Sequence, residues 1–166
     1  MKTIIVDDEL WAVQQLEDAF SGQSNIQLMG CFRDPLKALR YAEENPVDFA
    51  LLDVKMTGMD GIELGRRLRQ KYPAVIIVYV SSYPEYFSDA YRDVRADYYM
   101  LKPYSEEDVQ DVLERVELLS RRQKKRVQVR TFGRFDLFID GNPVRFSNAK
   151  AKELLAVCID RKGGVV

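Results

Sequence analysis

Acidic side chains, a serine and a lysine follow directly on short apolar runs in the first two thirds of this 166-residue chain. Three carboxylates that converge on one crevice repel one another unless a cation lies among them. Carboxylate oxygens suit Mg²⁺, which proteins commonly hold with one or two carboxylates together with phosphate oxygens. A hydroxyl and an ammonium at the same place would contact the oxygens of a phosphoryl group. The residues concerned are Asp7, Asp8, Asp53, Ser81 and Lys102.

The elements that must bring these side chains together are apolar strands alternating with amphipathic helices over residues 1–120. Runs that are apolar throughout are typical of strands in a parallel sheet that is covered on both faces. We therefore predict an α/β fold with a doubly wound, five-stranded parallel sheet. The predicted strands are residues 3–6, 26–32, 49–52, 74–80 and 97–101.

Start signals and apolar periodicity place helices between these strands. Asp34-Pro35 supplies an N-cap and a proline at the first helical position, Ser105 caps the last helix, and a short helix is expected at about 84–92. Two helices have clear apolar faces. The first face comprises Leu10, Val13, Leu16 and Phe20, and the face of the last helix comprises Val109, Val112, Leu113, Val116 and Leu119.

In a doubly wound sheet the ligand site lies beyond the carboxyl ends of the strands. Each polar residue there has an ordinary explanation by itself, such as a solvated turn for Asp7 and Asp8 or a cap for Asp53. The occurrence of all these residues at the ends of four predicted strands is hard to explain by solvated turns and helix caps alone. Asp53 follows the third of the five strands, so it is the best-placed nucleophile for a transferred phosphoryl group.

The composition excludes several other kinds of site and of protein. The chain has no histidine, which removes Ser-His-Asp and Cys-His catalysis and every zinc site that needs histidine. The two cysteines, Cys31 and Cys158, form no metal-binding spacing, so we expect free thiols in a reducing compartment. The acidic N-terminus is unlike a signal peptide, and no apolar run approaches the roughly 20 residues that span a bilayer. We therefore expect a cytoplasmic protein without a membrane segment.

Two other activities of this fold class are disfavoured by single positions. A haloacid-type phosphatase would need a second aspartate two residues after its nucleophile, and that position is Lys55. A flavin or dinucleotide site would need a Gly-rich or Ser/Thr-rich loop after the first strand, where the chain has Asp7-Asp8-Glu9.

Residues 1–120 resemble the receiver domain of bacterial two-component response regulators. The segments IIVDDE, LLDVKMTGMDG, VIIVYVSS and DYYMLKPY occur in that family's order and spacing and cover the whole domain. The resemblance implies a flavodoxin-like fold with strand order 2-1-3-4-5. It also implies a phosphorylation-gated switch rather than an enzyme, although such a domain assists its own phosphorylation and dephosphorylation.

The resemblance also implies a role for each site residue. Mg²⁺ would be held directly by Asp8, through water by Asp7, and by Asp53 and the backbone carbonyl of Lys55. The remaining roles are phosphoryl acceptor for Asp53, switch hydroxyl for Ser81, aromatic switch for Tyr99, and phosphoryl contact for Lys102, with a cis bond before Pro103.

Three positions depart from that family's commoner pattern. Thr57 stands where proline is usual, so we expect the loop after Asp53 to be less rigid. Ser82 would narrow access to the phosphoryl group, and the cation of Lys55 would alter the phosphoryl lifetime.

The formal net charge of −1 conceals an asymmetry, since residues 1–120 carry a net charge of −9 and residues 121–166 a net charge of +8. Such a split indicates an acidic module joined to one directed at a polyanion. Residues 121–126 (RRQKKR) are predicted to be a basic linker that includes the end of the last receiver helix.

Residues 127–166 resemble the opening of an OmpR-like winged-helix output domain of the SARP type. Alternating segments predict antiparallel strands at 127–132, 135–140 and 143–146, with a turn at Asp140-Gly141. The chain stops before the recognition helix and wing that this resemblance implies, so we expect a longer regulator. A helix is predicted at 148–160, with Ala151, Leu154, Leu155, Cys158 and Ile159 facing inward.

The sequence thus predicts a response regulator that accepts a phosphoryl group on Asp53 from a sensor histidine kinase and gates a DNA-binding, transcription-regulatory output. DNA would be contacted through the full-length output domain. A homodimer would form through the face of the fourth helix, fifth strand and fifth helix. The alternative is an interaction module with a non-DNA output, gated by phosphorylation or independent of it.

Overall fold

The computed structural model describes residues 1–123, 127–130, 135–139, 142–146 and 148–160. The chain divides into two compact units, Met1–Ser120 and Arg121–Val166. Within the described part of the chain, no helix combines the length and apolar character needed to cross a membrane.

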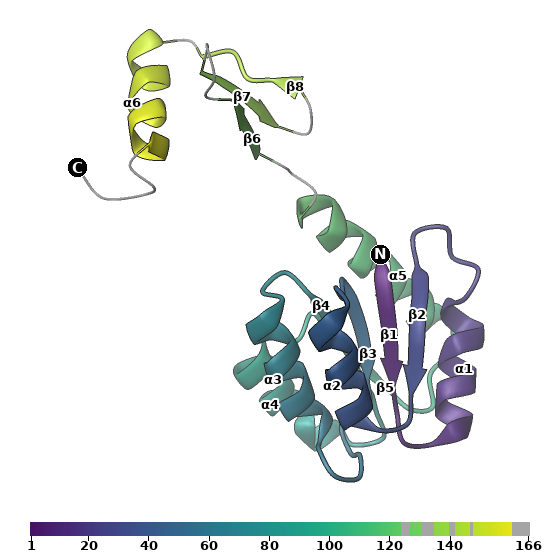
Figure 1. The fold of residues 1–166 in the computed structure, drawn as a ribbon. Helices are drawn as coiled ribbons and strands as arrows, with labels where there is room; N and C mark the ends of the chain where they lie inside the picture. The colour runs from purple at the N-terminus through teal and green to yellow at the C-terminus, as the bar shows by residue number, and fades with distance from the viewer. Residues whose placement is uncertain (124–126, 131–134, 140–141, 147, 161–166) are drawn as a thin grey trace. The chain divides into compact units, whose positions relative to one another are not determined.

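The first unit contains a five-stranded parallel sheet in the order β2-β1-β3-β4-β5 (Figure 1). This order and the parallel pairing confirm the predicted doubly wound α/β fold. The five predicted strands are present, with bounds that differ by at most two residues from the expected ones. They are β1 Lys2–Val6, β2 Gln27–Phe32, β3 Phe49–Leu52, β4 Ile76–Ser81 and β5 Tyr98–Leu101.

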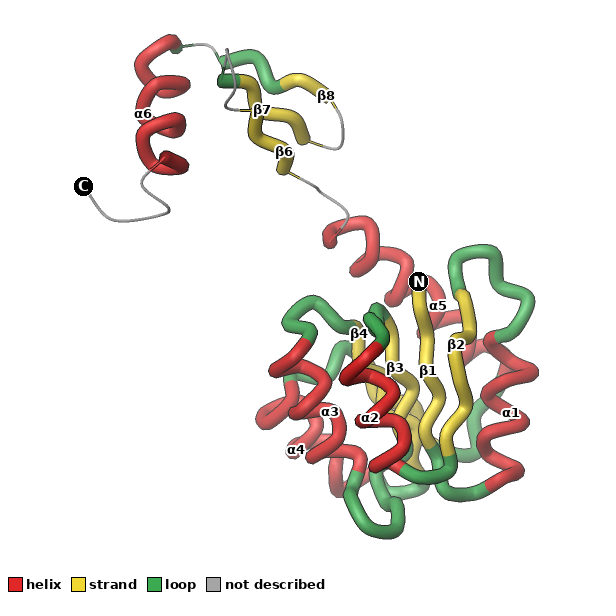
Figure 2. The backbone as a smooth tube through the Cα atoms, in the orientation of Figure 1, coloured by secondary structure: helices red, strands yellow, loops and turns green. Residues whose placement is uncertain are grey.

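Helices cover both faces of this sheet (Figure 2). One apolar core is formed with α1 and α5, and the other with α2, α3 and the helical segment that precedes β5. The central strands β3 and β4 contribute to both cores because successive side chains of a strand point to opposite faces. The helix bounds are α1 Leu10–Phe20, α2 Pro35–Glu44, α3 Gly61–Lys71 and α5 Glu106–Gln123.

The predicted helix starts are confirmed by the capping contacts. The Asp34 carboxylate accepts a hydrogen bond from the Leu36 N–H at 2.9 Å. The Ser105 hydroxyl accepts from the Asp108 N–H at 3.2 Å, and the Asp108 carboxylate accepts from the Ser105 N–H at 2.7 Å. This reciprocal pair is a capping box, which satisfies N–H groups that the first helical turn leaves without a partner.

The apolar face of α5 is buried as predicted, whereas the predicted face of α1 is wrong at its first position. Val13, Leu16 and Phe20 are buried, but Leu10 is 50% exposed, and Ala12 is buried in the same helix. Leu10 is the first residue of α1, and Trp11 beside it in the chain is also exposed.

The short helix expected at about 84–92 is an irregular helical segment from Pro84 to Val94. It consists of a 3-10 turn, the single α-helical turn α4 (Phe87–Asp89) and a π-helical turn over Ala90–Val94. The segment ends at Arg95, whose φ of 55° lies in the left-handed region.

The second unit contains a small antiparallel sheet, β6-β7-β8, followed by α6. The third strand is shorter and begins earlier than predicted. Residues 124–126 of the predicted linker, the predicted turn at 140–141, and residues 161–166 of the predicted output fragment fall outside the described residues. The bounds are β6 Val127–Arg130, β7 Asp136–Ile139, β8 Asn142–Pro143 and α6 Ala149–Asp160.

The inward face predicted for α6 is wrong at two of its positions. Ala151 is exposed and Leu154 is 64% exposed, whereas Leu155 is half-buried. The Lys152 ammonium lies 3.4 Å from a carboxylate oxygen of Asp136 in β7. This contact places the Lys152 side of α6 near β7, and Leu154, two positions further along the helix, lies on nearly the opposite side. Cys158 and Ile159 were also predicted to face inward, and the structure describes only the backbone at these two positions.

Candidate functional site

Two carboxylates and one ammonium meet at the carboxyl edge of the parallel sheet. Asp7 follows β1 and is fully buried, and Asp53 follows β3 and is 6% exposed. The Lys102 ammonium, directly after β5, donates to Asp7 Oδ2 at 2.6 Å and to Asp53 Oδ1 at 3.1 Å. The apolar strands β1 and β3 pair from Thr3 with Phe49 to Val6 with Leu52, so their ends are level and the two carboxylates lie side by side.

Burial and charge set the protonation of this group of three. Burial raises the pKa of Asp53, and the Lys102 ammonium offsets only part of that effect. For Lys102, burial lowers the pKa, but the hydrogen bond to Asp7 and the charge of Asp53 outweigh it and the net shift is upward. The ammonium is therefore firmly protonated, and Asp53 is a carboxylate from which burial has removed much of the solvating water.

Asp8 does not join this group. Its Oδ2 atom accepts hydrogen bonds from the Thr57 N–H at 2.9 Å and from the Thr57 hydroxyl at 3.1 Å. The Arg33 guanidinium donates to the Asp8 backbone carbonyl at 3.2 Å. Within the described part of the chain no three acidic, cysteine or histidine side chains lie close enough together to hold a metal ion. The expected convergence of three carboxylates is thus present for Asp7 and Asp53 only.

The resemblance to receiver domains implies Mg²⁺, and two side chains at this edge supply donors of the type that such an ion takes. The side chains of Asp7 and Asp53 offer oxygen donors only, which hard divalent cations prefer. An ammonium already lies between these two buried carboxylates, as expected at a place where the charge of a cation is needed. Asp8 follows Asp7 directly, and Thr57 binds one oxygen of its carboxylate, Oδ2.

Ser81 and Tyr99 are both connected to the backbone of Tyr83. Ser81, the fully buried last residue of β4, accepts a hydrogen bond from the Tyr83 N–H at 3.3 Å. The Tyr99 hydroxyl donates to the Tyr83 carbonyl at 2.5 Å. The Tyr99 ring contacts Phe87, with the ring centroids 5.7 Å apart. A change in either side chain therefore acts on the segment that leads from β4 into α4, a connection through Tyr83 that the sequence did not reveal.

The Lys55 side chain turns away from the three charged groups. Its ammonium lies 4.7 Å from the ring centroid of Tyr86, a cation–π contact. Its effect on a phosphoryl group remains a prediction, and the same holds for Ser82, which is exposed.

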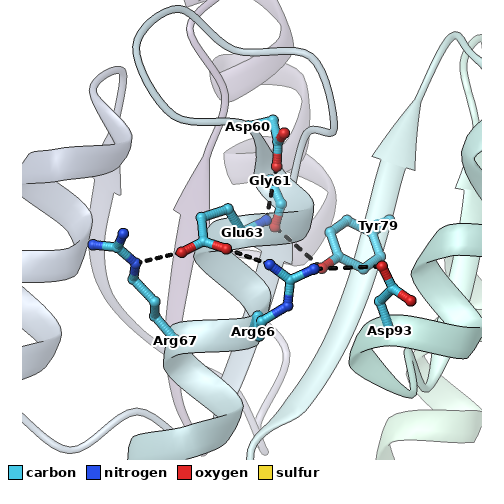
Figure 3. Close-up of polar contacts among 7 residues, drawn as sticks. All are labelled: Asp60, Gly61, Glu63, Arg66, Arg67, Tyr79 and Asp93. Carbon is cyan, nitrogen blue, oxygen red and sulfur yellow. Dashed lines mark hydrogen bonds and ion pairs between the residues drawn. The ribbon is translucent and has the colours of Figure 1, made fainter.

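Gly61 is the first residue of α3 (Figure 3), and it lies against the backbone of Asp53. Its N–H donates to the Val54 carbonyl at 2.9 Å, and its carbonyl accepts from the buried Tyr79 hydroxyl at 3.1 Å. A Cβ atom at this position would lie only 1.9 Å from the Asp53 carbonyl oxygen. The close approach of Gly61 to Asp53 was not predicted from the sequence, although the Asp60-Gly61 pair directly before an apolar helix was an available signal.

The other contacts in Figure 3 are a helix cap, two ion pairs within α3 and one ion pair from α3 to the helical segment before β5. The Arg67 guanidinium donates to Glu63 at 2.8 Å, and the Arg66 guanidinium contacts both Glu63 and, at 3.4 Å, Asp93. Because these side chains are substantially exposed, such pairs contribute little stability. The Asp60 cap, which accepts from the Glu63 N–H at 2.7 Å, has a clearer structural role in fixing where α3 begins.

The response regulator receiver domain family matches residues 3–114. The chain belongs to this family. The match extends from β1 into α5 and contains the three charged groups at the sheet edge. The receiver fold and the cis peptide bond between Lys102 and Pro103, both expected from the sequence, are present in the structure.

Relatives with names and solved structures agree on this assignment. The chain is 32% identical over 124 residues to the transcriptional regulatory protein YpdB of Escherichia coli, a match that covers 75% of this chain and 50% of YpdB. Protein MrkE of Klebsiella pneumoniae is 32% identical over 116 residues, which covers 70% of this chain and 43% of MrkE. The matches thus span about half the length of these curated relatives.

Two solved receiver structures share the fold. The response regulatory domain of MrkE from Klebsiella pneumoniae superposes with a TM-score of 0.66 at 29% identity, covering 76% of this chain and all of that domain. The receiver domain of AraT from Geobacillus stearothermophilus gives a TM-score of 0.65 at 26% identity, covering 74% of this chain and 98% of that domain.

Proposed function

We propose that Asp53 accepts a phosphoryl group from the phosphohistidine of a sensor histidine kinase, with Mg²⁺ as cofactor. The observation that carries this proposal is the contact of one partly buried ammonium, that of Lys102, with both Asp7 and Asp53. An Asp53 oxygen forms the new bond to phosphorus while the phosphorus–nitrogen bond of the donor breaks, and its electron pair returns to the imidazole. Lys102 then contacts the phosphoryl oxygens and so stabilises charge that would otherwise face Asp7.

The Mg²⁺ ion would be held by Asp7, Asp8, Asp53 and the backbone carbonyl of Lys55. When bound, Mg²⁺ would neutralise charge on the carboxylates and on the incoming phosphoryl group. The burial of Asp53 supports its assignment as the phosphoryl acceptor, because a poorly solvated carboxylate attacks phosphorus with less water to displace.

Phosphorylation would act on the rest of the unit through Ser81 and Tyr99. A Ser81 hydroxyl that turns toward the phosphoryl group gives up its hydrogen bond to the Tyr83 N–H. Tyr99 is tied to the same residue, so both side chains bias the position of the segment after β4. The phosphoryl contacts then shift an equilibrium between two arrangements of this segment, as in other charge-driven switches.

The test is incubation of the chain with acetyl phosphate and Mg²⁺. We expect a mass increase of one phosphoryl group, which peptide mapping after reduction of the acyl phosphate locates at Asp53. Omission of Mg²⁺ is expected to abolish the labelling. No labelling in the presence of Mg²⁺, or labelling at another residue, would contradict the proposal.

We propose a DNA-directed output for the full-length protein, which works in the cytoplasm. The net charge of +8 in residues 121–166 and the name of the relative YpdB, a transcriptional regulatory protein, support this output. The order of three short antiparallel strands followed by α6 is consistent with the opening of a winged-helix domain. A phosphorylation-gated module with a non-DNA output is the alternative, and a DNA-binding assay on the full-length protein distinguishes the two.

We also propose that phosphorylation promotes a homodimer through the face of α4, β5 and α5. Charged residues of both signs on this face suit a symmetric contact. Sedimentation with beryllofluoride and Mg²⁺ is expected to show a dimer, and sedimentation without them a monomer. A monomer under both conditions would exclude this interface. The charged residues are Arg92, Asp93, Arg95, Asp97, Asp111 and Arg115, of which Asp93 and Asp97 pair with Arg66 and Arg69 of α3 in the same unit.

A further inference from the structure

Tyr79 is a fully buried tyrosine of β4 whose hydroxyl group reaches the start of α3 (Figure 3). In the sheet it pairs with Leu52 of β3, the residue directly before Asp53. The Tyr79 hydroxyl donates to the Gly61 carbonyl at 3.1 Å. Burial raises the pKa of this hydroxyl, so it stays a protonated donor. A buried tyrosine hydroxyl needs a partner, and here the partner is the first residue of the helix that follows Asp53.

Gly61 connects this hydrogen bond to the backbone of the phosphoryl acceptor. Its N–H donates to the Val54 carbonyl at 2.9 Å. A Cβ atom on Gly61 would lie only 1.9 Å from the Asp53 carbonyl oxygen, so the two backbones are in close contact. A displacement of Gly61 is therefore passed on to the backbone of Asp53 and Val54.

Gly65 leaves the space that the Tyr79 hydroxyl occupies, one helical turn further along α3. A Cβ atom at this position would lie 2.1 Å from the hydroxyl oxygen of Tyr79. Glycine destabilises the interior of a helix relative to alanine. One contact thus gives both glycines of α3 a purpose, because Gly61 supplies the carbonyl and Gly65 the room for the donor.

We propose that Tyr79 is a positioning residue for phosphoryl transfer, whose hydroxyl holds Gly61 and, through Gly61, the backbone of residues 53–55. The inference rests on the proposed function, in which Asp53 is the acceptor and the Lys55 carbonyl is a ligand of Mg²⁺. Because Tyr79 is fully buried, it acts through Gly61 and not by contact with the phosphoryl group. Small displacements of reacting groups lower rates strongly, even when their cause lies away from the chemistry.

The test compares Tyr79→Phe with Tyr72→Phe. Each substitution removes one phenolic hydroxyl and keeps the ring. The Tyr72 hydroxyl also contacts backbone carbonyls, those of Ala42 and Asn45 at 2.7 and 2.9 Å, but at the opposite end of α3. Tyr72→Phe therefore matches Tyr79→Phe in chemistry and in the kind of contact that is lost. The measurement is the rate of labelling by acetyl phosphate over a series of Mg²⁺ concentrations.

We expect Tyr79→Phe to be labelled roughly threefold to tenfold more slowly at saturating Mg²⁺, the effect of one hydrogen bond. It should also need more Mg²⁺ for its half-maximal rate, because the Lys55 carbonyl is displaced together with Asp53. Rates are compared under conditions in which every chain is fully folded, so a loss of stability alone leaves both quantities unchanged. Tyr72→Phe should keep both values of the unmodified chain.

Gly65→Ala provides a second test of the same contact. By itself the added Cβ atom displaces the Tyr79 hydroxyl, so labelling should slow by a similar factor. In Tyr79→Phe that oxygen is absent, and the other close neighbours of the Cβ atom lie at 3.1 and 3.2 Å. The double variant should therefore be labelled like Tyr79→Phe alone, since substitutions that act through one contact are not additive.

Three results would overturn the inference and leave the proposed function intact. The first is an unchanged rate and Mg²⁺ requirement in Tyr79→Phe. The second is an equal slowing of Tyr72→Phe, and the third is a full additional loss when Gly65→Ala is combined with Tyr79→Phe. If the unmodified chain is not labelled at all, the proposed function fails and the role of Tyr79 fails with it.

Discussion

Asp53→Asn is expected to accept no phosphoryl group from acetyl phosphate in the presence of Mg²⁺. The asparagine amide keeps the shape of the side chain and can still accept a hydrogen bond from Lys102, but it has no carboxylate oxygen to attack phosphorus. Removal of a covalent nucleophile reduces rates by far more than removal of a positioning contact, so labelling should fall by more than about a hundredfold.

The matched control is Asp89→Asn. It makes the same chemical change at an exposed aspartate of α4 that has no part in the charged group at the sheet edge. This variant is expected to be labelled like the unmodified chain. Labelling of Asp53→Asn at an unchanged level would show that another residue is the acceptor.

The same substitution should also stabilise the metal-free fold at neutral pH. Burial raises the pKa of Asp53 despite the nearby Lys102 ammonium, so folding opposes the ionised form of this residue. A raised pKa in the folded state adds stability below the unfolded-state pKa, and that stability is lost as the pH rises through the folded-state pKa. Where the pH lies above the folded-state pKa the unmodified chain has lost this stability, and asparagine avoids the loss.

We therefore expect Asp53→Asn to raise the free energy of unfolding by about 1 kcal/mol at pH 7 in EDTA. The difference should shrink as the pH is lowered and Asp53 becomes protonated. Urea unfolding of both chains at several pH values measures it. A difference that does not vary with pH would mean that the ionisation of Asp53 is not its cause.

The part of the site that could be predicted from the sequence is the part fixed by strand ends. Strands such as Phe49–Leu52 are apolar in every position, so their bounds and the polar residues after them are readable from the pattern. The pairing of Asp7, Asp53 and Lys102 follows from parallel strands that end at one edge.

The contacts that could not be predicted depend on where loops carry side chains after the strands end. Asp8 is adjacent to Asp7 in the chain, yet it binds Thr57, which lies 49 residues away. No periodicity fixes that choice, because it depends on the path of the loop between β3 and α3. Leu10 is similar: its helical spacing predicted burial, but it is half exposed at the first position of α1.

Gly61→Ala is expected to be the most destabilising single substitution at the candidate site. The added Cβ would lie 1.9 Å from the Asp53 carbonyl oxygen and 2.9 Å from the Asp53 carbonyl carbon. Both are backbone atoms, which no side-chain rotation can move aside. The start of α3 has to shift away from β3, which strains the Gly61 N–H contact with Val54 and the contact of its carbonyl with the Tyr79 hydroxyl.

Overpacking of this kind costs about 3 kcal/mol, at the upper end of the usual range because backbone has to move. Gly58→Ala is the matched control in the same loop. Gly58 has a φ of 91°, so alanine there is strained, but its added Cβ has no atom within 4 Å and the cost should be near 1 kcal/mol. Chemical denaturation gives both values.

Phosphoryl acceptance separates a local effect from general loss of stability. Because the shift begins at the carbonyl of Asp53 itself, Gly61→Ala should accept phosphoryl groups from acetyl phosphate more slowly even under conditions where the variant is fully folded. Gly58→Ala should keep nearly the rate of the unmodified chain. If the two variants lose equal stability and equal rate, the close approach of Gly61 to Asp53 is not what positions the acceptor.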